Sequence, residues 1–279
     1  MKSEDFQFIS KMLKAASGLI LTEEKSYLLE SRLMPVARKH SLPDLDALVA
    51  ELKSGLKKEL AEEVVEAMTT NESFFFRDVK PFDQFRDIVL PNLLASRAST
   101  KKIRIWCAAC SSGQEPYSLA MILNEEKAKM PGWSYEILAT DISLEIIDKA
   151  KTGYYSQFEV QRGLPIQLLM KYFNQEGDKW KIDPILAKNI NFKFFNLLND
   201  PSIHGKFDVV FCRNVLIYFE QETKKEVLEK IAKQIPGDGV LYLGGAETVI
   251  GITDKFQPVA GQRGLYNLTG QENLAKTAS

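Results

Sequence analysis

Residues 102 to 118 read KIRIWCAACSSGQEPYS, and this stretch decides the fold. The first seven residues are rich in β-branched and aromatic side chains, which predicts a strand. From Glu115 onward, EPYSLAMILNEEKAK has the apolar spacing of an amphipathic helix, and Pro116 suits its first turn. The loop between strand and helix contains a single glycine, Gly113. We therefore expect a strand, a tight loop and a helix, the first unit of an alternating sheet.

Two cysteines of this stretch, Cys107 at the end of the predicted strand and Cys110 in the loop, have the C-x-x-C spacing found in zinc and redox sites. A zinc site usually needs four ligands, and the other candidates, Cys212, His40 and His204, are not paired at ligand spacing. A thioredoxin-like motif would begin a helix directly after its strand, whereas SSGQEP intervenes here. We therefore interpret the cysteines as small residues in a tight loop and predict no metal site.

The alternation of strands and helices continues along the chain. Helices are predicted at 143–152, opened by Ser143, and at 221–235, and strands at 135–142, 190–195, 207–214 and 239–245. Residues 254–268 resemble an antiparallel hairpin at the sheet edge. The pattern predicts an α/β fold with a doubly wound, Rossmann-like parallel sheet and a terminal antiparallel hairpin, in a domain at residues 101–270.

Two regions fall outside this alternation. Residues 153–190 break it, and KYFNQEGDKWKI at 171–182 predicts a small hairpin that turns at Glu176–Gly177, so we interpret 153–190 as an inserted β-subdomain. Residues 1–80 have helical spacing and predict an N-terminal all-α domain. Its helices are expected to stop at Gly18, to begin again at the N-cap Thr22, and to end near Gly55 and Thr69. Residues 81–100 are predicted to form a linker helix that Pro91 interrupts.

Composition excludes several classes of protein. Of 279 residues, 45% are hydrophobic and 26% charged, as in soluble globular proteins, and the net charge of −1 gives no overall attraction to nucleic acid. No apolar run approaches the ~18 residues of a membrane span, and the N-terminus lacks a signal core. Three cysteines fit a reducing compartment. We expect a cytoplasmic protein that neither binds nucleic acid nor inserts into a membrane.

The loop after the first strand should lie at the carboxyl edge of the sheet, where doubly wound folds bind ligands. It lacks the glycines of a dinucleotide fingerprint, and Glu115 stands where a phosphate would want positive partners. The second strand ends in Asp141, which is placed to accept the hydroxyls of a ribose; its alternative role, capping the next helix, already falls to Ser143. A further strand ends in Cys212 and Arg213, which should border the same pocket.

These features together indicate an S-adenosylmethionine-dependent methyltransferase. A single-glycine loop, an acid after the second strand and a terminal hairpin are typical of that class. A sulfonium cation favours carboxylates over basic groups, and Glu115 meets that requirement.

Several longer motifs resemble the chemotaxis receptor glutamate O-methyltransferases of the CheR type. The resemblance covers nearly the whole chain and rests on TTNESFFFRD (69–78), CAACSSGQEPYSLA (107–120), ATDIS (139–143), FDVVFCRNVLIYF (207–219) and GGAETV (244–249). It implies transfer of a methyl group from S-adenosylmethionine to glutamate carboxylates of chemoreceptors, with S-adenosylhomocysteine as the product. The implied partner is the cytoplasmic helical region of those receptors.

The resemblance also implies a role for individual residues. Arg77 and Tyr218 would act at the methyl-transfer centre, Arg77 on a segment that closes over the cofactor. The residues implied in cofactor binding are Asn71, Ser73, Arg77, Glu115, Asp141, Asn196, Leu197, Cys212 and Arg213.

Two other functions remain open at this point. One is an S-adenosylmethionine-binding signalling module without catalysis, which would need neither Arg77 nor Tyr218. The other is a methyltransferase for another substrate, such as a different carboxylate, a small molecule or a nucleic acid, although the chain lacks an N-P-P-Y-type motif.

A basic stripe is a candidate docking surface for the receptor. Lys25, Arg32 and Lys39 recur every seven residues, which would keep them on one face of a helix. Charge runs are usually no more than a solvated face, and that alternative stays open.

Overall fold

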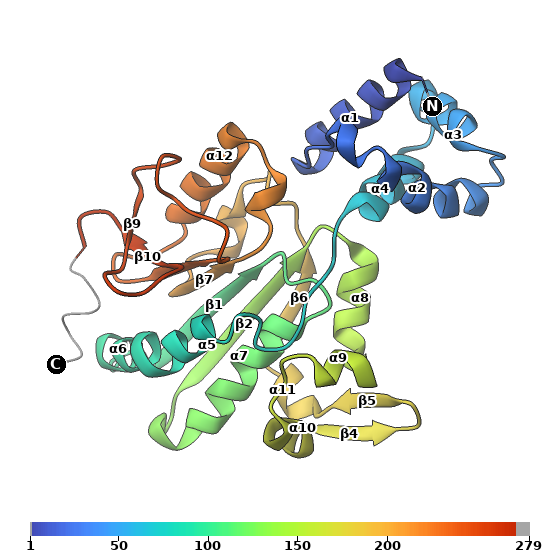
Figure 1. The fold of residues 1–279 in the computed structure, drawn as a ribbon. Coiled ribbons are helices and arrows are strands. Elements are labelled where there is room, and N and C mark those ends of the chain that lie inside the picture. The colour runs from blue at the N-terminus through green and yellow to red at the C-terminus, as the bar shows by residue number, and fades with distance from the viewer. Residues whose placement is uncertain (1, 272–279) are drawn as a thin grey trace. The chain divides into compact units, whose positions relative to one another are not determined.

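The structure is a computed structural model in which residues 2–271 are described. The chain forms two compact units, which we describe separately. The first contains the residues up to Thr70 together with Tyr218–Thr223, and the second contains Asn71–Ile217 and the chain from Lys224 onward (Figure 1). The boundary after Thr70 lies ten residues before the boundary at residue 80 expected from the sequence, because Phe75 and Phe76 belong to the core of the second unit.

The first unit is helical, as predicted. Gly18 and Gly55 end helices in the left-handed conformation, which glycine adopts without steric cost. Thr22 does not begin the second long helix; it precedes a single 3-10 turn, Glu23–Lys25, and the helix itself starts later. The helices of this unit are α1 (Ser3–Ser17), α2 (Tyr27–Lys39), α3 (Leu45–Ser54) and α4 (Lys58–Met68).

The predicted basic stripe is not one free surface. Arg32 donates from one guanidinium nitrogen to the carbonyls of Met68 (2.8 Å) and Thr69 (2.9 Å), so it satisfies carbonyl groups at the end of α4. Lys39 pairs with Glu63 at 3.0 Å, and Lys25 lies in the 3-10 turn before α2. The heptad spacing therefore does not give one exposed stripe, because the helix starts after Lys25 and Arg32 is half-buried against the end of α4.

The second unit is built on a sheet in the order β6-β2-β1-β7-β8-β10-β9. Neighbours from β6 to β8 run parallel, whereas β10 is antiparallel to both β8 and β9, so the predicted sheet and terminal hairpin are confirmed. The strands are β1 (Lys102–Ala108), β2 (Ser134–Asp141), β6 (Ile190–Phe194), β7 (Val209–Cys212), β8 (Val240–Leu243), β9 (Phe256–Pro258) and β10 (Leu265–Leu268).

The insertion carries a small antiparallel sheet of its own, in the order β3-β5-β4. The hairpin between β4 and β5 turns at Gly177 and Asp178, close to the predicted turn. Its elements are β3 (Tyr154–Ser156), α9 (Gln157–Gln161), α10 (Ile166–Tyr172), β4 (Phe173–Glu176), β5 (Lys179–Ile182) and α11 (Pro184–Ala187). We call residues 153–190 the β-subdomain.

Pro91 does not interrupt the helix before the sheet. Instead α5 (Lys80–Gln84) continues through a π-helical turn, Phe85–Val89, into α6 (Leu90–Ser96). In a π turn the N–H of Leu90 bonds the Phe85 carbonyl, five residues back, and this wider ladder accommodates a proline that lacks a donor. Helical periodicity alone does not distinguish this arrangement from a break.

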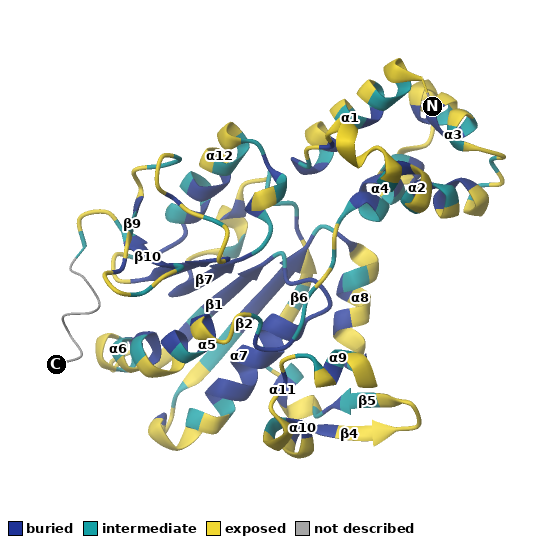
Figure 2. Cartoon of the chain, in the orientation of Figure 1, coloured by how far each residue is buried: buried dark blue, intermediate teal, exposed yellow. Residues whose placement is uncertain are grey.

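The core of the second unit lies around the central strands. Figure 2 shows β1, β7 and α7 almost wholly buried. Helices α7 (Gln114–Glu125) and α8 (Leu144–Thr152) both pack against β2 and β6, and α12 (Gln221–Ala232) precedes β8. Within residues 2–271, no helix is long and apolar enough to cross a membrane.

Candidate active site

The parallel strands bring their carboxyl ends to one edge of the sheet. Ala108 of β1 pairs with Thr140 of β2 and with Cys212 of β7, and Asp141 pairs with Phe194 of β6. The residues that follow these four strands therefore lie along the same edge, as the sequence predicted from the alternation of elements.

The loop after β1 is tight and highly constrained. Ala109, Ser111 and Gly113 all have positive φ, of 63°, 50° and 93°. A Cβ at Gly113 would lie 3.1 Å from the Ala150 side chain and 3.2 Å from the Tyr155 hydroxyl, so both conformation and space require glycine there. The small side chains of this loop are thus explained by packing.

Asp141 is buried at the end of β2 and holds this loop. One carboxylate oxygen accepts the Ser111 N–H at 2.8 Å, and the other accepts the Ser143 N–H at 3.1 Å. Ser143 caps α8 by accepting the Ile146 N–H at 3.0 Å. The cap role thus belongs to Ser143, and Asp141 is a carboxylate at the ligand edge, as a ribose-binding acid requires.

Glu115 and Arg213 form a buried ion pair beside the loop. The guanidinium of Arg213, whose side chain is 1% exposed, donates to Glu115 at 3.0 Å and to Asp78 at 2.6 Å. Burial raises the pKa of Glu115, and the Arg213 charge opposes that shift. The Nε of Arg213 has no hydrogen-bond partner among the described residues. Arg213 therefore pairs with one buried acid, Glu115, and with one exposed acid, Asp78.

The segment Asn71–Asp78 is fastened to this edge by its backbone. Ser111 donates its hydroxyl to the Asn71 carbonyl at 2.7 Å, and the Phe76 N–H donates to Ser118 at 3.1 Å. Arg213 also donates to the Arg77 carbonyl, at 2.9 Å. Phe76 and Asp78 adopt positive φ of 50° and 69°, conformations that persist only when the surroundings impose them.

Within this segment the side chains divide between core and surface. Phe75 and Phe76 are buried, as expected for a phenylalanine run that serves packing, whereas Ser73 and Arg77 are half-buried. Arg77 donates to the Glu72 carbonyl at 2.9 Å, and its guanidinium lies 5.5 Å from the centre of the Phe74 ring.

The remaining predicted residues lie on the neighbouring strand ends. Asn196 and Leu197 follow β6 and are half-buried, and Asn196 accepts the Leu198 N–H at 3.0 Å. Cys212 ends β7 and is fully buried. Tyr218 groups with the helical unit, where its carbonyl accepts the Ile20 N–H at 2.9 Å.

One residue that we had not placed in the site organises the loop after β7. Glu247 accepts the backbone N–H groups of Asn214 (2.8 Å), Gly244 (2.7 Å), Val215 (3.0 Å) and Ile217 (3.3 Å). It therefore fixes the chain that leads from β7 to Tyr218. Its place in the GGAETV stretch was the available signal, but no local pattern shows that three of its four partners lie about thirty residues earlier.

The cysteines are free, and burial raises the pKa of Cys107, Cys110 and Cys212 well above the usual value. The reactive form of a cysteine is the thiolate, so these thiols are inert packing groups. Among residues 2–271, no cluster of three His, Cys, Asp or Glu side chains is arranged to hold a metal.

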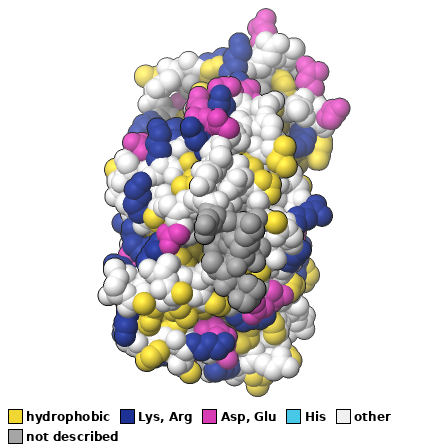
Figure 3. Space-filling view, turned by 90° about the vertical axis from the view of Figure 1, so that its left-hand side faces the viewer, with side chains coloured by type: hydrophobic (Ala, Val, Ile, Leu, Met, Phe, Trp, Pro, Cys, Tyr) yellow, Lys and Arg dark blue, Asp and Glu magenta, His cyan; other side chains and the backbone are white. Residues whose placement is uncertain are grey.

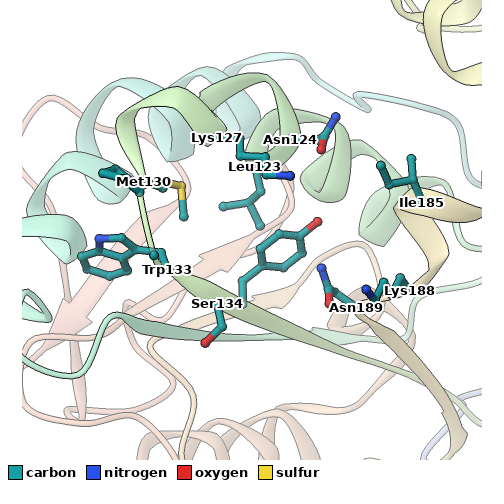
Figure 4. Close-up of a pocket in the computed structure, with 12 residues that line it drawn as sticks. Leu123, Asn124, Lys127, Met130, Trp133, Ser134, Ile185, Lys188 and Asn189 are labelled. Carbon is teal, nitrogen blue, oxygen red and sulfur yellow. The ribbon is translucent and has the colours of Figure 1, made fainter.

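A separate pocket of about 420 Å³ lies at the other end of β2, near Ser134 and Tyr135, and is shown in Figure 4. Trp133, Met130 and Leu123 line it from the turn and helix before β2, and Lys188 from the chain before β6. It is not part of the candidate site, which lies at the carboxyl ends of the strands.

The surface charge shows no large patch of one sign on the face drawn in Figure 3, where basic and acidic side chains are interspersed.

Comparison with known proteins agrees with this geometry. Residues 4–69 match the all-alpha domain of the CheR methyltransferases, and residues 71–265 match their SAM-binding domain. The chain belongs to the CheR methyltransferase family. It is 38% identical to the chemotaxis protein methyltransferase Cher2 of Pseudomonas putida, over 94% of this chain and 96% of that protein. It is also 38% identical to chemotaxis protein methyltransferase 1 of Vibrio cholerae, over 95% and 96% of the two chains.

The residues at the sheet edge suit the cofactor of a CheR methyltransferase, S-adenosylmethionine. Asp141 offers a carboxylate at the position where this fold class holds a ribose, and the narrow loop at Gly113 offers no pyrophosphate cradle. Glu115 lies at the start of α7 beside this loop, where it pairs with Arg213. The family and the donor set therefore agree that this chain is a SAM-dependent methyltransferase.

Proposed function

We propose that this CheR-family methyltransferase transfers the methyl group of S-adenosylmethionine to glutamate side chains of chemoreceptors. One observation carries the proposal. Arg213 bridges Glu115, at the start of α7, to the backbone of Arg77, and so joins the predicted cofactor edge to the predicted catalytic arginine. A module that only bound the cofactor would need neither Arg77 nor Tyr218, and the chain has both.

The chemistry needs little from the protein beyond placement. A glutamate carboxylate is ionised at pH 7 and can attack a methyl sulfonium without a general base. Holding two reactants in line contributes up to ~7–11 kcal/mol in well-oriented systems. In this proposal Arg77 orients the substrate carboxylate through its planar donor fork, and Tyr218 contributes a hydroxyl.

The cofactor residues take distinct parts in the proposal. Asp141 accepts from the ribose, Asn196 and Leu197 border the adenine, and Glu115 attracts the charged methionine end. The other residues proposed to border the cofactor are Asn71, Ser73, Cys212 and Arg213. Arg213 is supported chiefly as the group that holds Glu115 and the Arg77 backbone in register, since its side chain is nearly wholly buried.

The proposed substrate is the helical cytoplasmic region of a chemoreceptor, which places the reaction in the cytoplasm. The matching relatives are chemotaxis protein methyltransferases over nearly their whole length. Transfer of labelled methyl groups to membranes that contain receptors tests the substrate class. The expected product is a base-labile ester on the receptor, and label that resists base would point to another acceptor.

The catalytic role of Arg77 has its own test. We expect Arg77→Ala to abolish nearly all methyl transfer while affinity for S-adenosylhomocysteine stays within about tenfold, ~1.4 kcal/mol. Arg86→Ala is the matched control, because Arg86 pairs with Asp83 and Asp87 on the helix before the sheet. Near-normal turnover of Arg77→Ala would remove Arg77 from the mechanism.

A further inference from the structure

The β-subdomain touches the segment that carries Arg77 through one arginine. Arg162 follows α9 and pairs with the Glu72 carboxylate at 2.6 Å. Its guanidinium lies 4.3 Å from the centre of the Phe74 ring. Arg77 lies 5.5 Å from the same ring and donates to the carbonyl of the same Glu72. Phe74 and Glu72 therefore each contact both arginines.

This cluster restrains Arg77 from two directions. A guanidinium over an aromatic face is attracted by the ring and stacks best in a parallel plane, so Arg162 fixes the orientation of Phe74. Arg77 lies against the same ring, so a change in the position of the ring would change the surface on which Arg77 rests. The Glu72 carboxylate neutralises the second positive charge, and the hydrogen bond and charge of Arg162 hold the pKa of Glu72 below its usual value. The pair therefore stays ionised at neutral pH.

A second contact shows that the β-subdomain and this segment are in direct apposition. A Cβ built on Gly163, next to Arg162, would lie 2.1 Å from the Phe75 carbonyl oxygen. Such an approach is possible only for glycine, so the backbone of the β-subdomain rests against the backbone of the segment. Arg162 is thus held at Phe74 by the chain that carries it.

Stability gives little reason for the ion pair. The side chains of Arg162 and Glu72 are 39% and 59% exposed, and pairs of this kind contribute about 0–1 kcal/mol. A loss of activity on removing this pair would therefore not be a consequence of unfolding.

We propose that Arg162 is a positioning residue for methyl transfer, through which the β-subdomain sets the orientation of Arg77. The inference rests on the proposed role of Arg77. It assigns the β-subdomain a part in the reaction itself, separate from any part in binding a receptor.

The test compares kcat with binding and stability for Arg162→Ala. We expect kcat for receptor methylation to fall about five- to twentyfold, with the receptor KM and the affinity for S-adenosylhomocysteine within twofold of the parent. The melting temperature should hardly change, because the pair is exposed. Arg162→Lys can keep the pair with Glu72 but loses the planar guanidinium next to Phe74, so it should recover only part of kcat.

The matched control is Lys149→Ala, which removes the 2.6 Å pair between Lys149 and Glu159 of α9 and should leave kcat unchanged. Phe74→Leu removes the ring that links the two arginines and should lower kcat as Arg162→Ala does. The double variant should then be no worse than either single one, because both act through one contact.

Three results would overturn the inference: a kcat for Arg162→Ala within twofold of the parent, a rise in receptor KM with kcat unchanged, or additive losses in the double variant. Arg77→Ala is measured in the same series. If Arg77→Ala is inactive while Arg162→Ala is normal, only the positioning role fails. If Arg77→Ala is itself active, the proposed role of Arg77 fails.

Discussion

At the scale of single residues, Asp141 has two tasks that can be separated. Its carboxylate holds the N–H groups of Ser111 and Ser143, and in the proposed site it also accepts from the ribose. We expect Asp141→Ala to weaken S-adenosylhomocysteine binding by about 1.5–3 kcal/mol, the scale of hydrogen bonds to a charged acceptor. Calorimetric titration measures this loss directly.

Ser143→Ala is the control for that measurement. It removes the cap of α8, which costs about 0.5–2 kcal/mol of stability, but leaves the Asp141 carboxylate in place. Its melting temperature should fall while its affinity for S-adenosylhomocysteine stays at the parent value. If Asp141→Ala behaves in the same way, Asp141 serves only the local backbone.

Residues such as Asp141 can be found from sequence because topology alone puts the end of β2 at the ligand edge. The position of Arg213 at this edge was also predicted, since it follows the strand run at β7. Its partners were not, because Asp78 and Glu115 lie far away along the chain and only tertiary packing brings them together. The proposed role of Arg162 was not predicted for the same reason, because nothing in its local sequence indicates that it contacts Phe74.

At the scale of elements, two glycines of the β-subdomain allow a paired experiment. Gly163 and Gly177 have similar positive φ, 83° and 64°. A Cβ at Gly163 would meet the Phe75 carbonyl oxygen at 2.1 Å, whereas nothing lies within 4 Å of a Cβ at Gly177. Both alanine variants carry the left-handed cost of about 1–2 kcal/mol, but only Gly163→Ala must also displace the segment that carries Arg77.

We therefore expect Gly163→Ala to lower both the melting temperature and kcat more than Gly177→Ala does. Thermal unfolding and methylation kinetics on the same preparations check this. Equal losses in the two variants would show that the backbone contact with Phe75 has no bearing on catalysis.

Elements with regular periods were predicted well, including the central strands and the helix that Ser143 opens. The π-helical turn at Phe85–Val89 was not, because its apolar positions fit an ordinary helix and Pro91 argues for a break. The start of α2 was misplaced for a related reason. Thr22 and the acids after it look like a helix N-terminus, but they begin only a single 3-10 turn.

At the scale of the whole molecule, the chain contains a helical unit and a unit with the methyltransferase sheet. If the helical unit binds the receptor through charge, the basic side chains that do so must be exposed. The Arg32 guanidinium donates to carbonyls at the end of α4, so replacing Arg32 would perturb the helical unit as well as any docking. We expect Arg32→Glu to destabilise the protein by about 1.5–3 kcal/mol, as when a charged hydrogen-bonding group is lost. A test of docking must leave Arg32 in place.

Lys25 and Arg38 are the basic residues of this region that suit the test, because both are exposed and Lys39 already pairs with Glu63. If the helical unit attracts acidic receptor helices, Lys25→Glu with Arg38→Glu should raise the receptor KM about three- to tenfold at low salt. The effect should shrink as salt rises, because the Debye length is ~10 Å at 0.1 M and falls to ~3 Å at 1 M. Affinity for S-adenosylhomocysteine should not change.

Methylation rates against receptor concentration at two ionic strengths measure both the rise in KM and its dependence on salt. A double reversal that matches the parent at both salt concentrations would mean that these charges are only solvated surface and that the receptor docks elsewhere.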